Sequence, residues 1–177
     1  DNPYLADFYA DMAVWAFHLN VFFLGHRADQ HLALANSPIS TIIDRSIYED
    51  AEIFARAALR LGTLSDRDYE NYRRVFDLIV GNLPSPDLLI HLKAPVPVLM
   101  GRIQQRARDM ELGITQEYLE LLDSLYVEWI NRFDICPVLM IRTDDLDFVH
   151  QPRHLDTVIS RIHDKLTGKE ELQFPDD

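Results

Sequence analysis

The chain has 177 residues, of which 47% are hydrophobic and 26% charged, a composition typical of one globular domain that buries a core. Its formal net charge of -12 argues against a general affinity for nucleic acid polymers or anionic membranes. The sequence holds one cysteine, no apolar run of about 18 residues and no signal-peptide pattern, so we expect a cytoplasmic protein without a membrane span.

The first half of the chain is predicted to alternate helix and strand. Apolar side chains recur every three to four residues over 15–35 and again over 69–79, which is typical of a helix that buries one face. Between them, the apolar run 39–43 follows Pro38 and predicts a buried strand.

The second half continues the alternation. Short apolar runs at 88–92 and 138–141 predict two further strands, each entered from a proline. A helical pattern covers 118–133, with Thr115 as a candidate N-cap, and another covers 155–166. Strands that alternate with helices predict an α/β fold with a mostly parallel sheet.

A carboxylate and an arginine follow the first predicted strand, in the tripeptide Asp44-Arg45-Ser46, and Asp50 comes five residues after the arginine. The carboxyl end of a strand is where open α/β sheets bind ligands. The alternative is a helix start, in which Asp44 or Ser46 caps a helix that begins near Ile47. The tripeptide alone leaves both interpretations open.

A basic cluster follows the second predicted strand and a helix entry at Pro95-Val96-Pro97. Arg102 and Arg106 are four residues apart, so they project from one helix face, and Arg108 follows closely. Converging guanidinium groups suit phosphate oxygens, because each presents paired donors in one plane. The alternative is a solvated helix face whose charge is balanced by neighbouring carboxylates.

Two polar side chains interrupt the apolar surface of the first long helix. Asn20 and Arg27 are seven residues apart and share a stripe. A buried amide and a buried guanidinium both need partners, which a structural ion pair or a small planar ligand can supply. Tyr9 precedes this helix and belongs either to the same pocket or to the core.

Five motifs occur in a fixed order along nearly the whole chain: Asn2-Pro3-Tyr4-Leu5, Phe8-Tyr9, Trp15-Ala16-Phe17, Asp44-Arg45-Ser46-x-Tyr48-x-Asp50 and Arg102-x-x-x-Arg106-x-Arg108-x-x-Glu111-x-Gly113-Ile114. Together they resemble the deoxynucleoside kinase family, the relatives of deoxycytidine, deoxyguanosine and deoxyadenosine kinases. The resemblance implies a kinase-like domain over 1–167, followed by an acidic tail over 168–177. It also implies transfer of the ATP γ-phosphoryl to the 5′-hydroxyl of a deoxynucleoside in nucleotide salvage, with Mg²⁺ as cofactor and a homodimer as the assembly.

The resemblance assigns a role to each matching residue around the deoxynucleoside. Arg45 would lie beside the 5′-hydroxyl and the phosphates, and Asp44 would help organise Mg²⁺. Tyr9 and Glu111 would hold the sugar 3′-hydroxyl.

The base edge would be read by Arg27 and Asp50 as a pair, which offers both donors and acceptors to a purine or cytosine edge, and purine deoxynucleosides are favoured. Asn20 stands where the family usually has a glutamine that reads the base. The shorter amide requires a shifted base or an intervening water.

On the phosphate side, Arg106 and Arg108 would be lid arginines that hold the transferred phosphate, and Arg102 would lie close to the ATP adenine. The loop that starts with Asp144 and Asp145 would pass near the same adenine. Without the resemblance, that acidic stretch is more typical of a solvated turn than of a cation site.

No G-x-x-x-x-G-K-[ST] phosphate loop occurs in the printed sequence, and its Gly-Lys pair, Gly168-Lys169, lacks the upstream glycine. In the family this loop leaves the first strand of a P-loop-kinase-like parallel sheet with the order 2-3-1-4-5. The three predicted strands would be the third to the fifth, with the first two absent from this chain. We therefore expect 39–43 to lie apart from the other two strands, and kinase activity to require an N-terminal segment that carries the loop.

Two alternative functions remain open. A nucleoside monophosphate kinase would need a second phosphate site, and the sequence offers no other arginine cluster. A catalytically inactive kinase-like subunit is favoured by the absent phosphate loop.

Overall fold

The structure is a computed structural model that describes residues 2–108, 113–144, 146 and 151–167. The chain divides into two compact units. The first comprises Asp1–Pro84 and Gly113–Phe133, and the second comprises Ser85–Leu112 and Asp134–Asp177.

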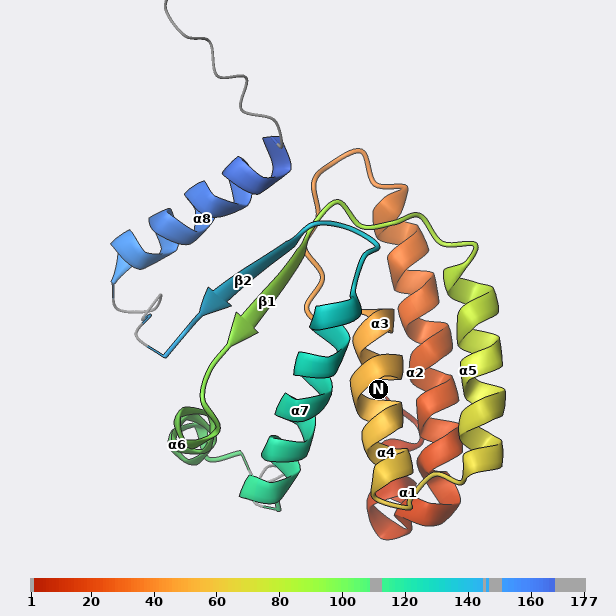
Figure 1. The fold of residues 1–177 in the computed structure, drawn as a ribbon. Coiled ribbons are helices and arrows are strands. Elements are labelled where there is room, and N and C mark those ends of the chain that lie inside the picture. The colour runs from red at the N-terminus through yellow and green to blue at the C-terminus, as the bar shows by residue number, and fades with distance from the viewer. Residues whose placement is uncertain (1, 109–112, 145, 147–150, 168–177) are drawn as a thin grey trace, which may run out of the picture. The chain divides into compact units, whose positions relative to one another are not determined.

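The first unit is helical (Figure 1). Its elements are α1 (Leu5–Ala10), α2 (Met12–Ala35), α3 (Ile47–Glu49), the π-helix η1 (Asp50–Ala55), α4 (Arg56–Arg60), α5 (Asp66–Val80) and α7 (Gln116–Arg132). The α3, η1 and α4 segments follow one another without a break, and η1 packs against α2, α5 and α7. The largest fully buried side chains come one each from α2, α3, η1, α5 and α7: Leu24, Ile47, Ile53, Tyr72 and Leu125.

The three longest of these helices begin at a side-chain cap. The Asp11 carboxylate accepts a hydrogen bond from Val14 N at the start of α2, and the Ser65 hydroxyl accepts one from Asp68 N at the start of α5. Thr115 Oγ1 accepts a hydrogen bond from Tyr118 N (3.2 Å), which confirms it as the cap of α7. Each such cap stabilises its helix by about 1 kcal/mol.

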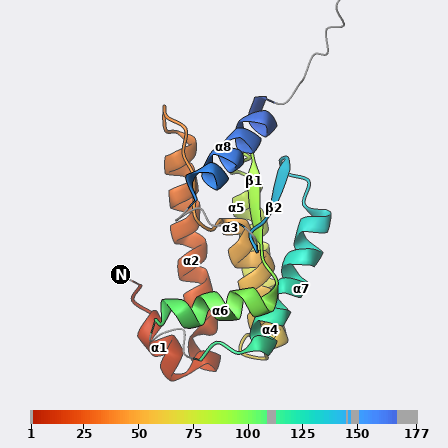
Figure 2. The same cartoon turned by 90° about the vertical axis from the view of Figure 1, so that its left-hand side faces the viewer.

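The second unit contains β1 (Leu89–Lys93), α6 (Val96–Arg106), β2 (Val138–Arg142) and α8 (Pro152–Thr167). The two strands are parallel and lie side by side in both views, with Leu89 opposite Val138 and Lys93 opposite Arg142 (Figures 1 and 2). Helix α6 begins directly after Pro95, as the proline pattern predicts. A parallel sheet flanked by helices confirms the α/β class.

The prediction of a strand at 39–43 is wrong. This segment has irregular backbone in the structure, and Ile39 and Ile42 are 73% and 85% exposed. A strand persists only where a neighbour satisfies its backbone hydrogen bonds, and among the described residues the ladder joins β1 to β2 alone.

Within the part of the chain that the structure describes, we find no helix whose length and apolar character would let it cross a membrane.

Candidate functional site

The tripeptide Asp44-Arg45-Ser46 leads directly into α3. Ser46 Oγ accepts a hydrogen bond from Glu49 N (3.4 Å), and Glu49 Oε2 accepts one from Ser46 N (3.0 Å). This reciprocal pair is a capping box, so the helix-start interpretation is confirmed with Ser46 as the cap. The side chains of Asp44 and Arg45 are not needed for the cap, and both residues are exposed. The cap and a ligand-binding role are therefore compatible.

Arg45 has a left-handed backbone conformation, with φ at 65°. A side chain in this region costs about 1–2 kcal/mol, because Cβ crowds the neighbouring carbonyl oxygen. The guanidinium carbon lies 4.5 Å from the centre of the Phe54 ring, which is a cation–π contact. Backbone strain of this kind clusters at functional sites. The Arg45 guanidinium thus lies against an aromatic side chain of the continuous helix that begins just after it.

Arg27 of α2 and Asp50 of η1 form the ion pair that the sequence analysis predicts. Arg27 Nε lies 3.4 Å from Asp50 Oδ2, and the two side chains are only 17% and 10% exposed. The atoms are not aligned as a hydrogen bond, and each is a buried polar atom without a hydrogen-bond partner among the described residues. The Arg27 Nη1 donates instead to Gln30 Oε1 (3.0 Å) and to the carbonyl oxygen of Asp44 (3.4 Å).

Burial raises the pKa of Asp50 from 3.8 to about 6. The Arg27 charge opposes this rise, Glu49 adds to it, and Arg45 opposes it. The carboxylate is therefore ionised at neutral pH but sits in surroundings that disfavour its charge. A ligand that donates a hydrogen bond to the Asp50 carboxylate would relieve this cost.

Asn20 and Arg27 lie on the same stripe of α2, and both are half-buried. Asn20 Nδ2 donates to the carbonyl oxygen of Ala16 (2.8 Å), four residues earlier in the helix. The amide donor is thus engaged by its own helix. The prediction that Asn20 reads the base is not tested by this contact.

The predicted sugar-binding pair cannot be compared directly. Tyr9, at the end of α1, is exposed and meets Phe8 edge to face, with 5.7 Å between ring centres. Glu111 lies outside the described residues. Burial raises the pKa of the Tyr118 hydroxyl, the Arg45 charge opposes this rise and Tyr9 adds to it, so these side chains of the first unit are close enough to interact electrostatically.

In the second unit, Arg102 is bound to the end of β2. Its Nη1 donates to Thr143 Oγ1 (3.0 Å), and its Nη2 donates to the Thr143 carbonyl oxygen. Thr143 is buried, and its backbone N–H donates to the carbonyl oxygen of Lys93 (2.8 Å). Arg102 therefore connects α6 to the carboxyl ends of both strands.

The other residues predicted to lie on the phosphate side are at or just after the ends of α6 and β2. Arg106 is the last residue of α6, and Arg108 comes after a left-handed Ala107. The Asp144 carboxylate accepts hydrogen bonds from Arg142, which lowers its pKa. Asp145 lies outside the described residues.

The expected Mg²⁺ site rests on one described carboxylate. No group of three or more His, Cys, Asp or Glu side chains in the described ranges is placed to hold a metal ion. In phosphoryl transfer, Mg²⁺ is usually bound by one or two carboxylates together with substrate phosphates and water. The exposed carboxylate of Asp44, next to Arg45, fits such a shared ligand set.

Three residues beside this site escaped the sequence analysis. Glu49 had a signal, because Ser-x-x-Glu before a helix is a capping-box pattern. Phe54 and Tyr126 had none. Phe54 reads as an ordinary apolar residue, and the Tyr126 hydroxyl donates to Glu49 Oε1 across 77 positions of sequence.

Comparisons with known proteins agree with this α/β architecture and identify its family. The family model described as deoxynucleoside kinase matches residues 1–167. The chain is 37% identical over 163 residues to the deoxyadenosine/deoxycytidine kinase of Bacillus subtilis (strain 168), a match that covers 91% of this chain and 75% of the relative. It is 34% identical over 172 residues to the deoxyguanosine kinase of the same organism, covering 92% of this chain and 79% of that relative.

Solved structures give the same result. A deoxyadenosine kinase from M. mycoides, with the products dCMP and a flexible dCDP bound, superposes with a TM-score of 0.78 at 27% identity. The match covers 93% of this chain and 82% of that chain. The chain therefore belongs to the deoxynucleoside kinase family.

Proposed function

We propose that this protein transfers the γ-phosphoryl group of ATP to the 5′-hydroxyl of a deoxynucleoside in nucleotide salvage, with deoxyadenosine and deoxyguanosine favoured. The observation that carries the proposal is the buried Arg27–Asp50 pair, whose facing atoms lack hydrogen-bond partners in the described structure. A buried polar atom left unpaired costs free energy that a ligand can recover. The relatives act on deoxyadenosine, deoxycytidine and deoxyguanosine, as their names state.

The Arg27–Asp50 pair presents a hydrogen-bond donor and a hydrogen-bond acceptor, which together match a base edge that carries both. The Asp50 carboxylate accepts hydrogen bonds and the Arg27 guanidinium donates them. The purines and cytosine have such an edge, whereas thymine has less need of a carboxylate acceptor and a guanidinium donor together. Asn20 adds an amide on the same stripe of α2, and Tyr9 with Glu111 would hold the sugar 3′-hydroxyl.

Phosphoryl transfer depends mainly on positioning and on stabilisation of charge in the transition state. Arg45 would stabilise charge at the 5′-oxygen and the phosphates, and Asp44 would hold Mg²⁺, which neutralises phosphate charge when bound. Because no phosphate loop occurs in the printed sequence, the activity is proposed for a polypeptide that includes one. The single cysteine suits a reducing compartment, in agreement with action in the cytoplasm.

The second unit would contribute its basic residues to the phosphates of ATP. Arg106 ends α6 and Arg108 lies two residues further on, so the two guanidinium groups could converge on phosphate oxygens. Arg102, together with Asp144 and Asp145, is proposed for the adenine side. The contact of Arg102 with Thr143 supports a fixed position for this guanidinium.

The experiment is a phosphorylation assay of the polypeptide that includes a phosphate loop, with ATP, Mg²⁺ and each of the four deoxynucleosides, run in parallel with the four deoxynucleoside monophosphates. We expect 5′-monophosphates as products, with the highest kcat/KM for the purine deoxynucleosides. Turnover of the monophosphates alone would identify a nucleoside monophosphate kinase. Binding of a deoxynucleoside without turnover would identify an inactive kinase-like subunit.

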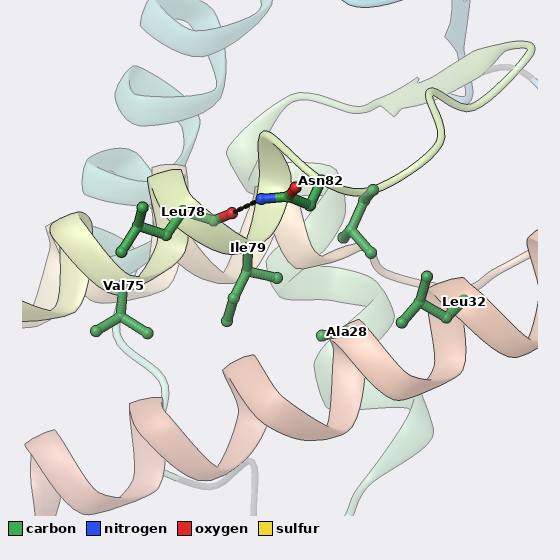
Figure 3. A pocket seen from close by; sticks show the side chains of 7 residues that line it. Ala28, Leu32, Val75, Leu78, Ile79 and Asn82 are labelled. Carbon is green, nitrogen blue, oxygen red and sulfur yellow. Dashed lines mark hydrogen bonds between the residues drawn. The ribbon is translucent and has the colours of Figure 1, made fainter.

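We also propose that the protein is a homodimer that associates through α2 and α5. A shallow groove of about 530 Å³ lies between these helices, lined almost entirely by apolar side chains (Figure 3): Ala28, Leu32, Val75, Leu78, Ile79, Asn82 and Leu83. The Asn82 amide donates to the Leu78 carbonyl oxygen (2.7 Å), so the polar group on this face is engaged within α5. Exposed apolar faces of this kind mark interaction surfaces. Light scattering should give twice the monomer mass, and Leu78→Lys should give the monomer mass.

A further inference from the structure

We propose that Glu49 is a positioning residue that holds Arg45 in its left-handed conformation, with the Tyr126 hydroxyl as its anchor on α7. The proposal rests on the proposed function, in which Arg45 acts on the reacting phosphate. It goes beyond that function because it assigns a task to two residues that the proposed function does not use.

The backbone on both sides of Arg45 is fixed by a side chain from elsewhere. The carbonyl oxygen of Asp44, in the peptide group before Arg45, accepts a hydrogen bond from Arg27 Nη1 (3.4 Å). The backbone N–H of Ser46, in the peptide group after Arg45, donates to Glu49 Oε2 (3.0 Å). Two fixed peptide planes determine the φ and ψ of the residue between them. This geometry explains why a non-glycine residue keeps φ at 65°.

The Glu49 carboxylate is itself held in place from a distant helix. One oxygen, Oε2, completes the capping box with Ser46, and the other, Oε1, accepts a hydrogen bond from the Tyr126 hydroxyl. A capping box requires only the first of these contacts. The second contact connects the turn to α7, which also packs against η1.

Tyr126 is suited to act as a permanent donor in this contact. Burial and the neighbouring Glu49 charge raise the pKa of its hydroxyl, so the proton stays on the tyrosine at any physiological pH. The Arg45 side chain depends on the same arrangement, since its guanidinium lies on Phe54 of η1. A change of φ at Arg45 would swing the guanidinium away from that ring and from the phosphate that it is proposed to meet.

Tyr126→Phe tests the anchor, because it removes one hydroxyl and leaves the ring. Tyr69→Phe is the matched control, a loss of the same group from a half-buried tyrosine on α5. We expect Tyr126→Phe to lower kcat by about 10-fold with less than about a threefold change in KM for the deoxynucleoside, and Tyr69→Phe to change neither beyond about twofold. A crystal structure of Tyr126→Phe should show Arg45 with a negative φ.

Glu49 gives an independent second test. Glu49→Ala removes both contacts of the carboxylate, whereas Glu49→Gln keeps an acceptor for Ser46 N and a polar group that can pair with the Tyr126 hydroxyl. We expect kcat to fall further for Glu49→Ala than for Tyr126→Phe, and Glu49→Gln to restore at least part of it.

The outcomes separate this inference from the proposed function. If the wild-type protein is a deoxynucleoside kinase, and Tyr126→Phe and Glu49→Ala keep both kcat and a positive φ at Arg45, the positioning role is wrong and the function stands. If the wild-type polypeptide that includes a phosphate loop phosphorylates no deoxynucleoside, the function is wrong. The φ of Arg45 in the Tyr126→Phe crystal structure then still decides the positioning role, and a retained positive φ overturns it.

Discussion

Asp50 and Glu52 lie two residues apart in the same π-helix, and their side chains are similarly buried, at 10% and 12% exposed, yet their surroundings differ. Glu52 Oε1 accepts a hydrogen bond from Arg73 Nη1 (2.6 Å), and Glu52 Oε2 accepts one from Arg132 Nη2. Arg56 adds an ion pair at 3.9 Å. The Asp50 carboxylate faces Arg27 without a hydrogen bond to it.

The helix geometry explains how neighbouring residues reach such different partners. Residues two positions apart point to nearly opposite sides of a helix. Asp50 therefore faces α2, and Glu52 faces α5 and α7, from which Arg73 and Arg132 come. The comparison suggests a physical criterion. A buried carboxylate with satisfied hydrogen bonds holds helices together, whereas one with an unsatisfied oxygen keeps hydrogen-bonding capacity that a ligand could use.

The largest expected effect is a loss of stability when Glu52, the carboxylate that joins three arginines, is replaced. Glu52→Gln removes the charge on which three arginines converge, so we expect the free energy of unfolding to fall by about 2–4 kcal/mol. Urea unfolding measures this change. The order of kcat/KM among the four deoxynucleosides should stay the same, and an altered order would show that the distinction between Glu52 and Asp50 is wrong.

The pH dependence of the free energy of unfolding tests the other carboxylate of the comparison, Asp50. The pKa of Asp50 is raised from 3.8 to about 6, so the folded state binds this proton more tightly than the unfolded state does. The free energy of unfolding should therefore fall as the pH rises from about 4 to about 6, by about 2–3 kcal/mol, and this contribution should be constant at higher pH.

Asp50→Asn removes this titration. The difference in unfolding free energy between the wild type and Asp50→Asn, measured between pH 4 and 8, isolates the contribution of Asp50 from that of other carboxylates. A difference that does not vary with pH would mean that Arg27 compensates the Asp50 charge as fully as the arginines around Glu52 compensate that carboxylate.

The smallest effect is expected at Glu128, which shares an arginine with Glu52. Glu128 accepts hydrogen bonds from Arg56 (2.6 Å) and Arg60 (2.8 Å), but its side chain is 41% exposed. Exposed ion pairs add little to stability, since water and salt screen them. Glu128→Gln should lower the midpoint of thermal unfolding much less than Glu52→Gln. Equal shifts would indicate that burial does not distinguish the two carboxylates.

The features that the sequence predicted correctly are those written in local patterns. The helix over 118–133 and its Thr115 cap follow from periodicity and capping chemistry, and the structure confirms both. The apolar stripe indicates that Arg27 needs a partner, and the resemblance to the family implies that this partner is Asp50.

The features that it missed depend on distant segments. The 39–43 run has the composition of a strand, but a strand also needs a paired neighbour, which local composition does not supply. The contact of Glu52 with Arg132 joins residues 80 positions apart, and only the packing of α7 against η1 brings them together. The left-handed backbone of Arg45 is equally invisible in the sequence, because it results from contacts made on both sides of the residue.

The most direct test of base recognition by Arg27 and Asp50 is steady-state kcat/KM for deoxyadenosine, deoxyguanosine, deoxycytidine and thymidine, measured for the wild type, Asp50→Ala and Glu52→Gln. An ill-matched base leaves buried polar groups unpaired, so removal of the carboxylate should weaken the purine deoxynucleosides and favour thymidine by about 10-fold or more in relative terms. Glu52→Gln should keep the wild-type order. If Asp50→Ala also keeps that order, the Arg27–Asp50 pair is structural and the base is recognised elsewhere.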